Sequence, residues 1–389
     1  MRMESLAAAP LRSEPSFAGR CQLEDGFHLA PWIEFDLAAL QSNWLALSSA
    51  AGTPNSFLEP WFLRPSLSTL DPAGYVELAL LVEDGALTGL LPLATSGHYQ
   101  ARPIPHLESW LHANMFCGAP LVAAGRETAF WRALLPALDG RAKTQWFAHL
   151  RHLPADSTIT AALIDLCAED NRACRTVYRE ERALLRSGLD RESHLARSFS
   201  RKRRKELARL DRRFRESGDI RLECIRSPIG LEAWIDAFLA LEQRGWKGAE
   251  GSALACDDRT RELFREVLCG AAEAGALERI AFFDGAEPVA MLATFLSGHG
   301  AFAFKTAYDE EFARFSPGML LQVENLALLD DPDLAWCDSC AAEDHPMIDR
   351  IWPDRRSMVW LTVAVGSGWR RKLGEVWAGV EAWRMEHRR

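Results

Sequence analysis

Residues 277–329 read LERIAFFDGAEPVAMLATFLSGHGAFAFKTAYDEEFARFSPGMLLQVENLALL, and this stretch decides the fold. Two apolar runs flank the Asp-Gly pair at 284–285, which is typical of a β-hairpin because Asp-Gly readily adopts the positive φ angles of a tight turn. The apolar run at 301–308 predicts a third strand, and the Ser-Pro-Gly sequence at 316–318 predicts the start of a helix over 319–329. Strands, turn and helix in this order predict an α/β lobe in which a mixed sheet is flanked by helices.

The same hairpin pattern occurs earlier in the chain. Apolar runs at 75–82 and 87–94 flank another Asp-Gly pair, and Ser-Gly-His follows both hairpins. Helical segments rich in Trp and Leu precede each copy, at 43–63 in the first and at 231–245 and 259–274 in the second. Asp-Gly hairpins are common, so chance similarity is the alternative. The pattern favours an internal duplication that gives two tandem lobes.

The segments between and around the hairpins suggest four regions. Residues 1–30 lack periodicity and contain several Pro and Gly, so we expect a disordered lead-in. The first lobe is expected over 31–190 and the second over 191–365. A basic amphipathic helix is expected at the end, over 366–389.

Composition limits the function classes. The 389 residues are 48% hydrophobic, which is enough for two sizeable cores. A net charge of -9 argues against a dedicated DNA-binding protein, which would be basic. The nine cysteines are scattered and no secretory signal is evident, so we expect a cytoplasmic protein with reduced thiols. No apolar run is long enough to span a bilayer, so any membrane contact would be peripheral, on the inner face.

The turn at 316–318 is a candidate phosphate site. A helix start offers N–H groups without helical partners and the positive end of a helix dipole, which suit a pyrophosphate. Helix capping uses the same residue types, with Ser316 as the cap and Pro317 in the first turn, and this is the alternative.

Four blocks of sequence support the phosphate interpretation. They read LEQRGWKG at 241–248, FKTAYDE at 304–310, ARFSPG at 313–318 and DSCAAEDHPMIDRIW at 338–352. In this order they resemble the cellulose-biosynthesis-type acetyltransferase branch of the GNAT superfamily. The first half of the chain resembles only the degenerate GNAT lobe found in such proteins and in Fem-type peptidyl transferases. The resemblance therefore implies two tandem GNAT-like lobes (the acyl-CoA N-acyltransferase fold), of which the second is catalytic.

The resemblance implies an acyl-CoA or similar thioester as donor substrate, with no permanently bound cofactor. The donor would lie along Arg314, Phe315, Ser316, Pro317, Gly318, Met319 and Leu320. The usual Gln/Arg-x-x-Gly-x-Gly/Ala pyrophosphate loop is absent, and Arg-Phe-Ser-Pro-Gly stands at 314–318 instead. This departure leaves three acyl carriers open: CoA, a carrier protein or tRNA.

Direct acyl transfer to an amine needs a base and no protein nucleophile. His345 is the first candidate, because an imidazole titrates near neutral pH and the adjacent Asp344 could orient it. The alternative is that His345 only stabilises a turn before a helix that begins near Met347. Lys305 is a third candidate because it stands among apolar residues. Tyr308 lies three residues further along the same strand, so the two side chains should point to opposite faces.

Four residues are candidates for contact with the substrate: Trp246, Lys247, Tyr308 and Asp338. Trp246 and Lys247 lie between two glycines, which predicts a flexible loop. The Cys-x-x-Cys pair at 337–340 is not accompanied by a second pair, and the neighbouring Trp336 indicates a buried strand. We therefore expect no metal site.

Two basic helices have alternative explanations. Residues 201–213 could form a solvated face, a clamp for phosphates or a dock for anionic lipids. Near the C-terminus one apolar stripe consists of Trp369, Leu373, Trp377, Val380 and Trp383. Core packing is the favoured interpretation of this stripe, and a membrane interface is the alternative.

These observations predict an acyl-CoA-dependent N-acyltransferase. Its partners would be the donor and an amine acceptor, either a long-chain amine such as a sphingoid base or an envelope amino sugar. One alternative is a non-catalytic GNAT-fold protein that binds lipid or carbohydrate. Another is an aminoacyl-tRNA-dependent transferase, which would need a broad basic tract.

Overall fold

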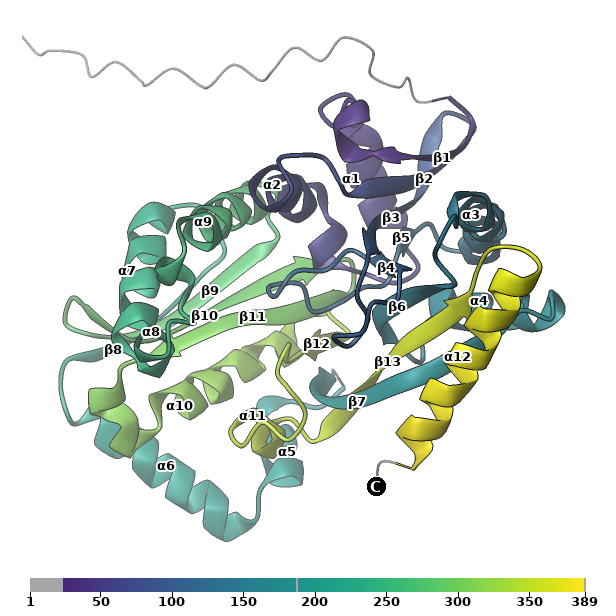
Figure 1. Cartoon of the computed structure of the whole chain (residues 1–389). Coiled ribbons are helices and arrows are strands. Elements are labelled where there is room, and N and C mark those ends of the chain that lie inside the picture. Colours follow the sequence, from purple (N-terminus) through teal and green to yellow (C-terminus); the bar gives the residue numbers. More distant parts are fainter. Residues whose placement is uncertain (1–23, 187, 388–389) are drawn as a thin grey trace, which may run out of the picture.

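The computed structural model describes residues 24–186 and 188–387, which form one continuous mixed sheet with helices on both faces (Figure 1). The strands are β1 (Gly26–Pro31), β2 (Glu77–Glu83), β3 (Ala86–Ser96), β4 (His106–Ser109), β5 (Leu121–Val122), β6 (Phe147–Pro154), β7 (Cys174–Arg186), β8 (Ile220–Ile225), β9 (Leu277–Asp284), β10 (Glu287–Ser297), β11 (Gly300–Tyr308), β12 (Trp336–Asp338) and β13 (Asp354–Ala364).

The helices alternate with these strands. The α-helices are α1 (Gln41–Ala50), α2 (Pro60–Leu70), α3 (Glu127–Arg141), α4 (Thr158–Glu169), α5 (Arg191–Ser198), α6 (Arg201–Arg215), α7 (Leu231–Arg244), α8 (Trp246–Ala249), α9 (Asp258–Glu273), α10 (Pro317–Glu324), α11 (Ile348–Ile351) and α12 (Trp369–Glu386). Short 3-10 helices are η1 (Trp32–Glu34), η2 (Ser56–Leu58), η3 (Leu254–Cys256), η4 (Glu310–Phe315) and η5 (Asn325–Asp330). Among the residues described, no helix is both long and apolar enough to cross a membrane.

The strand order is β1-β2-β3-β4-β6-β13-β7-β12-β11-β10-β9-β8, with β5 beside β3. The order is symmetric: when β1, β2, β3, β4, β6 and β7 are matched in turn to β8, β9, β10, β11, β12 and β13, it is the same from either end. Each half contains one parallel pair, β4 with β6 and β11 with β12. This symmetry supports the internal duplication, and the predicted fold of two tandem α/β lobes is confirmed.

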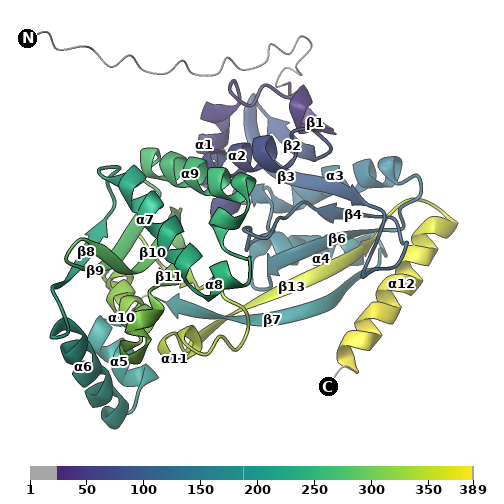
Figure 2. The same ribbon diagram turned by 60° about the vertical axis from the view of Figure 1, so that its left-hand side comes forward.

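The two halves exchange their last strands. Strand β13 comes from the end of the chain yet pairs with β6 and β7 of the first half, and β7 in turn pairs with β12 of the second. The segment 354–364, which we expected in the second lobe, is therefore inserted into the sheet of the first. One sheet thus runs through both lobes, as Figure 2 shows.

Both predicted hairpins are present. In the first, Asp84 and Gly85 have φ angles of 51° and 72° and form the two-residue loop between Glu83 and Ala86. In the second, Asp284 pairs with Glu287, so the loop begins at Gly285. The carboxylate of Asp284 accepts a hydrogen bond from the N–H of Asp219 at 2.8 Å, which ties this hairpin to the start of β8.

The structure corrects two predictions, one at each end of the chain. Within the expected lead-in, 26–30 belong to β1, which pairs with β2, while 1–23 lie outside the described residues. At the other end, α12 packs across β7 and β13, but Trp369, Leu373, Val380 and Trp383 are exposed. The prediction that this stripe packs into the core is wrong for these four residues, whereas Trp377 is partly buried against Tyr99. The buried face of the helix consists of Gly374, Ala378 and Glu381.

In the second lobe the two faces of the sheet pack on different helices. Phe302 and Phe304 of β11 join the core that contains residues of α7 and α9. Ala301 and Ala303 face the other core, with residues of α6 and α10. This alternation matters for the site because β11 carries candidate residues on both faces.

Candidate active site

The candidate site lies where strands β11 and β12 separate. The two strands pair in parallel over three residue pairs only, which end at Phe302 and Asp338. Strand β11 continues to Tyr308, whereas the chain leaves the sheet after Asp338. Ligands of open α/β sheets bind beyond the carboxyl ends of the strands, where neighbouring connections diverge. We call this place the strand divergence.

The Ser-Pro-Gly turn starts helix α10 on one face of the strand divergence. Ser316 has a φ of 51°, and within the described chain its side chain makes no capping hydrogen bond to α10. Capping by the hydroxyl therefore does not explain the turn. A Cβ added to Gly318 would lie 3.4 Å from the Tyr308 ring and 3.3 Å from the sulfur of Met347. The turn, the end of β11 and the segment before α11 thus meet at Gly318.

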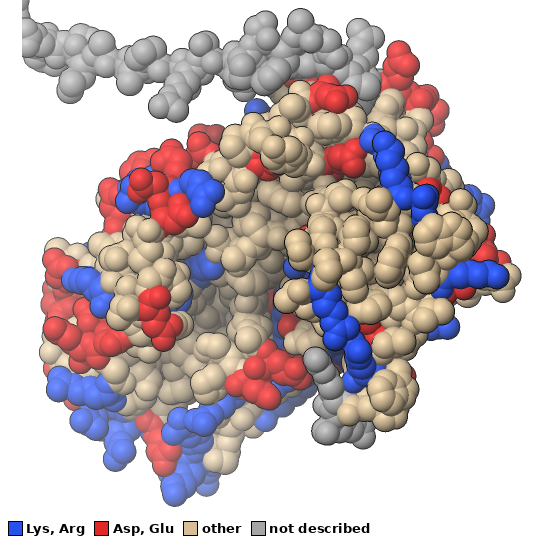
Figure 3. Space-filling model, in the orientation of Figure 1, with Lys and Arg blue, Asp and Glu red and all other residues tan. Residues whose placement is uncertain are grey.

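Helix α6 lies beside this turn. It contains nine basic and two acidic residues, and Figure 3 shows blue surface on the lower left of the molecule, where this helix lies. The ring centroid of its buried Phe214 lies 6.2 Å from that of Phe312 and 5.8 Å from that of Phe315. Both of these phenylalanines belong to η4. The apolar face of α6 therefore packs against the segment that contains Arg314, and Arg215 at the end of α6 pairs with Glu324 at the end of α10, at 3.1 Å. The positive charge of α6 and the start of α10 both favour an anionic group.

Lys305 and Tyr308 point to opposite faces, as their spacing predicts. A β-bulge leaves Phe304 without a partner on β10, which places Lys305 on the same side as Phe304. The Nζ of Lys305 lies 5.3 Å from the Phe116 ring centroid and 5.4 Å from that of Phe304. Burial, and then repulsion by Lys247, lower the pKa of Lys305 from 10.5 to about 8. Near neutral pH this lysine can therefore both hold and release a proton.

A cavity of about 340 Å³ lies between the lobes on the Lys305 side. The first lobe supplies most of its lining, and the second lobe supplies residues just after β12. The lining includes His112, Phe116, Arg151, His152, Glu180, Arg182 and Cys340. Figure 3 shows a hollow on this face, between the helices of the second lobe and the first lobe. We call this cavity the inter-lobe pocket.

Arg182 organises the floor of the inter-lobe pocket. Its guanidinium is buried, donates to Glu180 and lies 2.7 Å from Nδ1 of His152. The same nitrogen lies 3.2 Å from the carboxylate of Glu180, so Arg182, Glu180 and His152 form one polar cluster. Burial lowers the pKa of His152.

His112 is a second imidazole at the inter-lobe pocket. Burial, and then the charge of Lys305, lower the pKa of His112 to about 4. The ring stacks on Phe62 with centroids 5.9 Å apart, and its Nε2 lies 3.1 Å from the hydroxyl of Ser66. A neutral His112 next to Lys305 does not repel that lysine, so the first lobe helps to set the environment of the candidate base.

Backbone strain is present at the same pocket. His152 and Cys340 have φ angles of 52° and 53°, in the left-handed region that non-glycine residues rarely adopt. Both residues line the pocket, at the ends of β6 and β12. Such strain tends to concentrate at functional sites, where the surrounding structure enforces it.

His345 and Asp344 lie in the segment before α11. The imidazole Nδ1 of His345 is buried and has no hydrogen-bond partner among the described residues. Asp344 is exposed with a φ of 59°, and no bond between its carboxylate and His345 is seen in the part of the chain described. The carbonyl of His345 accepts from the N–H of Asp349 at 3.2 Å, so the residue also helps to start α11.

The remaining predicted substrate residues are engaged in the structure. The carboxylate of Asp338 is fully buried and pairs with Arg356 at 3.1 Å. Lys247 pairs with Glu242 at 2.7 Å, and Trp246 is half exposed. The predicted loop at this place is wrong, because Trp246–Ala249 forms the short helix α8. The carboxylate of Glu310 accepts from the N–H of Trp246 at 2.7 Å and stabilises its first turn.

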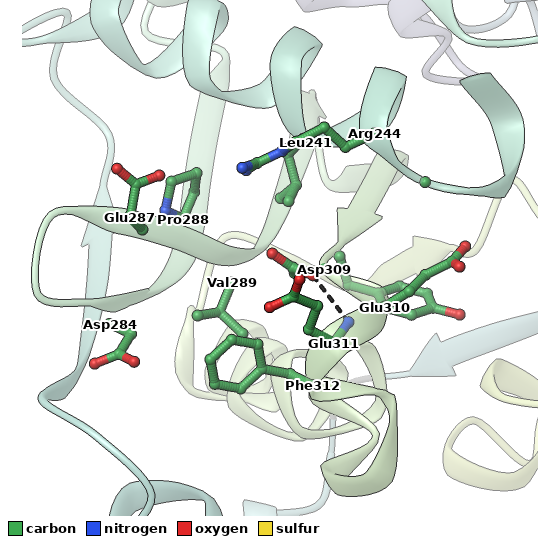
Figure 4. A pocket seen from close by; sticks show the side chains of 12 residues that line it. Leu241, Arg244, Asp284, Glu287, Pro288, Val289, Asp309, Glu310, Glu311 and Phe312 are labelled. Atoms are coloured by element: carbon green, nitrogen blue, oxygen red, sulfur yellow. Dashed lines mark hydrogen bonds between the residues drawn. The ribbon is translucent and has the colours of Figure 1, made fainter. Parts of the chain in front are cut away.

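A larger cavity of about 560 Å³ lies beside η4 (Figure 4). Its lining contains five carboxylate residues and one arginine: Asp284, Glu287, Asp309, Glu310, Glu311 and Arg244. In Figure 4 the N–H of Glu311 donates to the carboxylate of Asp309, at 2.9 Å. An acidic lining repels phosphate. This larger cavity is therefore a poor site for an anionic group.

Comparisons with known proteins agree with the fold. Residues 201–345, which include the turn, the strand divergence and His345, match the family model described as an acetyltransferase (GNAT) domain. This region of the chain is therefore similar to a GNAT acetyltransferase domain. No curated protein sequence matches the chain significantly.

Solved structures extend the likeness to both lobes. FemX superposes with a TM-score of 0.54 at 10% identity, over 87% of this chain and 98% of that chain. The C-terminal domain (DUF2156) of a putative lysylphosphatidylglycerol synthetase from Agrobacterium fabrum gives 0.53 at 11% identity, over 89% and 97%. A conserved protein of unknown function from Bacteroides thetaiotaomicron gives 0.55 at 13% identity, over 85% and 98%. At these identities the likeness is one of fold.

Sequence reasoning missed the contribution of the first lobe. His112, Arg151, His152 and Arg182 all line the inter-lobe pocket but come from the half of the chain expected only to support the site. Their sequence signal is weak, because each lies in an irregular connection or among other charges. The strand exchange brings them together, and periodicity does not reveal that exchange.

Proposed function

We propose that the protein transfers an acyl group from an acyl-CoA thioester to a primary amine by direct attack. The observation that carries this proposal is the arrangement of β11, whose two faces present Tyr308 beside the donor turn and Lys305 beside the inter-lobe pocket. Donor and acceptor could therefore approach the strand divergence from different sides. On the four sequence blocks, we assign the chain to the cellulose-biosynthesis-type branch.

In this proposal the donor phosphates bind at residues 314–320. The first turn of α10 supplies N–H groups and a positive helix end, and α6 adds cations. A thioester held in this way would extend past Gly318. Because Gly318 has no side chain, the Tyr308 ring and the Met347 sulfur lie close to its backbone at this point. The acyl carbonyl would then lie at the strand divergence.

Lys305 is our first candidate for the base. The amine nitrogen attacks the thioester carbonyl, a C–N bond forms, and the C–S bond breaks to release the thiol. The proton lost by the amine passes to Lys305 and then to the leaving sulfur. A pKa of about 8 suits this task, because the lysine is partly neutral at working pH. His345, with its buried and unpaired Nδ1 among the described residues, is the second candidate.

The acceptor would place its polar head in the inter-lobe pocket. Five of the twelve residues that line this pocket carry charged or imidazole side chains, which can hydrogen-bond to a hydroxylated amine head. A lipid amine such as a sphingoid base and an envelope amino sugar both carry such a head. We place the protein in the cytoplasm, with peripheral contact to the inner face of the membrane.

A thermal-shift titration with CoA, acetyl-CoA and palmitoyl-CoA tests donor binding. A ligand that binds only the folded state raises the melting temperature. The release of free thiol is then followed with a long-chain 2-amino-1,3-diol and with glucosamine as acceptors. We expect a larger shift with the long-chain donor and thiol release that depends on the acceptor.

Three outcomes would count against the proposal. No shift with any donor would favour the non-catalytic lipid- or carbohydrate-binding alternative. Binding of tRNA that weakens steeply with salt would favour aminoacyl transfer. If His345→Ala lowers turnover strongly while Lys305→Met does not, the base is His345.

A further inference from the structure

Helix α12 carries its large apolar side chains on the outside. Trp369, Leu373, Val376, Val380 and Trp383 are separated by four, three, four and three residues, so they form one stripe along the helix. Trp369 and Val376 are 65% exposed and Trp383 is 59% exposed. We call these five residues the α12 stripe.

The attachment of α12 to the protein does not use this stripe. Gly374 and Ala378 are buried, and a Cβ added to Gly374 would lie 2.1 Å from the carbonyl oxygen of Trp146. Arg371 adds an ion pair with Asp139 at 2.6 Å. Small residues let the helix lie close to the sheet, so the large residues are left free on the opposite side.

The size of the stripe limits what can cover it. It spans about 20 Å of helix and exposes on the order of 500 Å² of mainly apolar surface. Contiguous apolar patches of this size on a monomer usually serve a function. A stable dimer buries about 800 Å² on each partner. The stripe alone is therefore too small to hold two copies together.

The chemistry of the stripe fits a lipid surface. A Trp stands at each end, and Trp prefers the boundary between the headgroups and the acyl chains. Three basic residues, Arg370, Lys372 and Arg384, lie along its flanks, compared with two acidic residues, Glu375 and Glu386. The sequence continues with Arg388 and Arg389. In Figure 3 the surface in this region is mostly uncharged, with blue along its borders. Apolar side chains bordered by cations are typical of a helix that lies on an anionic bilayer.

A series of ring contacts connects the inner side of α12 with the inter-lobe pocket. Trp377, which is not part of the stripe, contacts Tyr99 at 6.2 Å, Tyr99 contacts His149 at 5.0 Å, His149 contacts Trp360 at 5.7 Å, and Trp360 contacts His152 at 5.3 Å. His152 lines the pocket. Figure 1 shows α12 along the outside of the first lobe, to one side of the central strands.

We propose that the α12 stripe docks the protein on anionic lipid bilayers, with the helix axis in the plane of the interface. Docking would bring the inter-lobe pocket close to the headgroup region, so that a lipid amine could present its head while its chain stays in the bilayer. That last consequence rests on the proposed function, whereas docking itself does not.

Flotation of the full chain with vesicles tests the docking. The vesicles are phosphatidylcholine alone or phosphatidylcholine with about 30% phosphatidylglycerol. We expect binding to the anionic vesicles that weakens as salt is added, together with a blue shift of Trp emission. Val376→Glu and Trp383→Glu should each lower the bound fraction about tenfold or more. The control Ile229→Glu changes a side chain that is 78% exposed but far from α12 in sequence, and it should bind like the wild type.

Two results would overturn the proposal. One is equal binding by wild type, Val376→Glu and Trp383→Glu. The other is a wild-type dimer in sedimentation velocity that Trp383→Glu dissociates, because the stripe would then contact a second copy. Acyl transfer between soluble substrates, without vesicles, should be unchanged in Trp383→Glu. Vesicle binding without acyl transfer to any acceptor would support docking and refute the proposed function separately.

Discussion

Replacement of Lys305 by Met should make the protein more stable and nearly inactive. Burial and the charge of Lys247 lower the pKa of Lys305 from 10.5 to about 8, so the folded protein disfavours the charged form. This fall in pKa corresponds to about 3 kcal/mol of unfolding free energy. Met has a similar length, keeps the contacts with Phe116 and Phe304, and carries no charge.

The pH dependence follows from the direction of this pKa change. Between pH 8 and 10.5 the unfolded chain binds more protons at this residue than the folded chain does. The free energy of unfolding therefore rises with pH in this window. Below about pH 8 the charged Lys305 destabilises the fold by its full amount. The advantage of Lys305→Met should be about 1–3 kcal/mol at pH 7 and should shrink as the pH approaches 10.

Urea unfolding of wild type and Lys305→Met at pH 7 and pH 9.5 measures this difference. The exposed Lys202→Met serves as the control and should change stability little at either pH. Turnover of Lys305→Met should fall by about 100-fold or more if the lysine is the base. Lower stability at pH 7, or a gain that does not depend on pH, would refute the assignment of a costly buried charge. Normal turnover would refute the assignment of the base.

Three further predictions concern packing and the donor turn. Gly374→Ala should cost about 1–3 kcal/mol because the new Cβ meets the carbonyl of Trp146, whereas Gly379→Ala, which meets nothing within 4 Å, should gain about 0.5–1 kcal/mol in thermal or urea unfolding. Gly318→Asp should weaken CoA binding about tenfold or more in a calorimetric titration at a temperature where the variant is folded, while Gly318→Ala retains binding. Asp338→Ala should cost about 3–5 kcal/mol because it leaves the buried Arg356 without its partner, and an unchanged unfolding midpoint would contradict this.

Local patterns predicted most of the elements correctly. The Asp-Gly pairs marked both hairpins. In the first, Asp84 and Gly85 both adopt the positive φ angles of the two-residue loop, and in the second Gly285 does so while Asp284 pairs with Glu287. The Ser-Pro-Gly turn specified the start of α10 at Pro317. The spacing of Lys305 and Tyr308 gave their opposite orientations, since side chains alternate along a strand and the bulge at Phe304 lies before both residues.

The candidate site was only half predictable. The donor segment lies in one continuous stretch, and its contact with Tyr308 joins residues ten positions apart. The pocket beside Lys305, by contrast, combines β6, β7 and the residue after β12. The role of Asp338 also depends on a distant partner, Arg356 on β13, which no local pattern identifies.

The sequence by itself determined the two tandem α/β lobes, the Ser-Pro-Gly turn before α10 and the helical nature of both basic segments. These features depend on turn residues and on hydrophobic periodicity within a few residues. Only the tertiary structure decided that β7 and β13 are exchanged between the lobes, that first-lobe histidines and arginines line the inter-lobe pocket, and that the α12 stripe faces outward. These features are properties of the whole packed chain. Which distant strands pair, and which face of a helix is buried, depends on which surfaces meet in the folded protein.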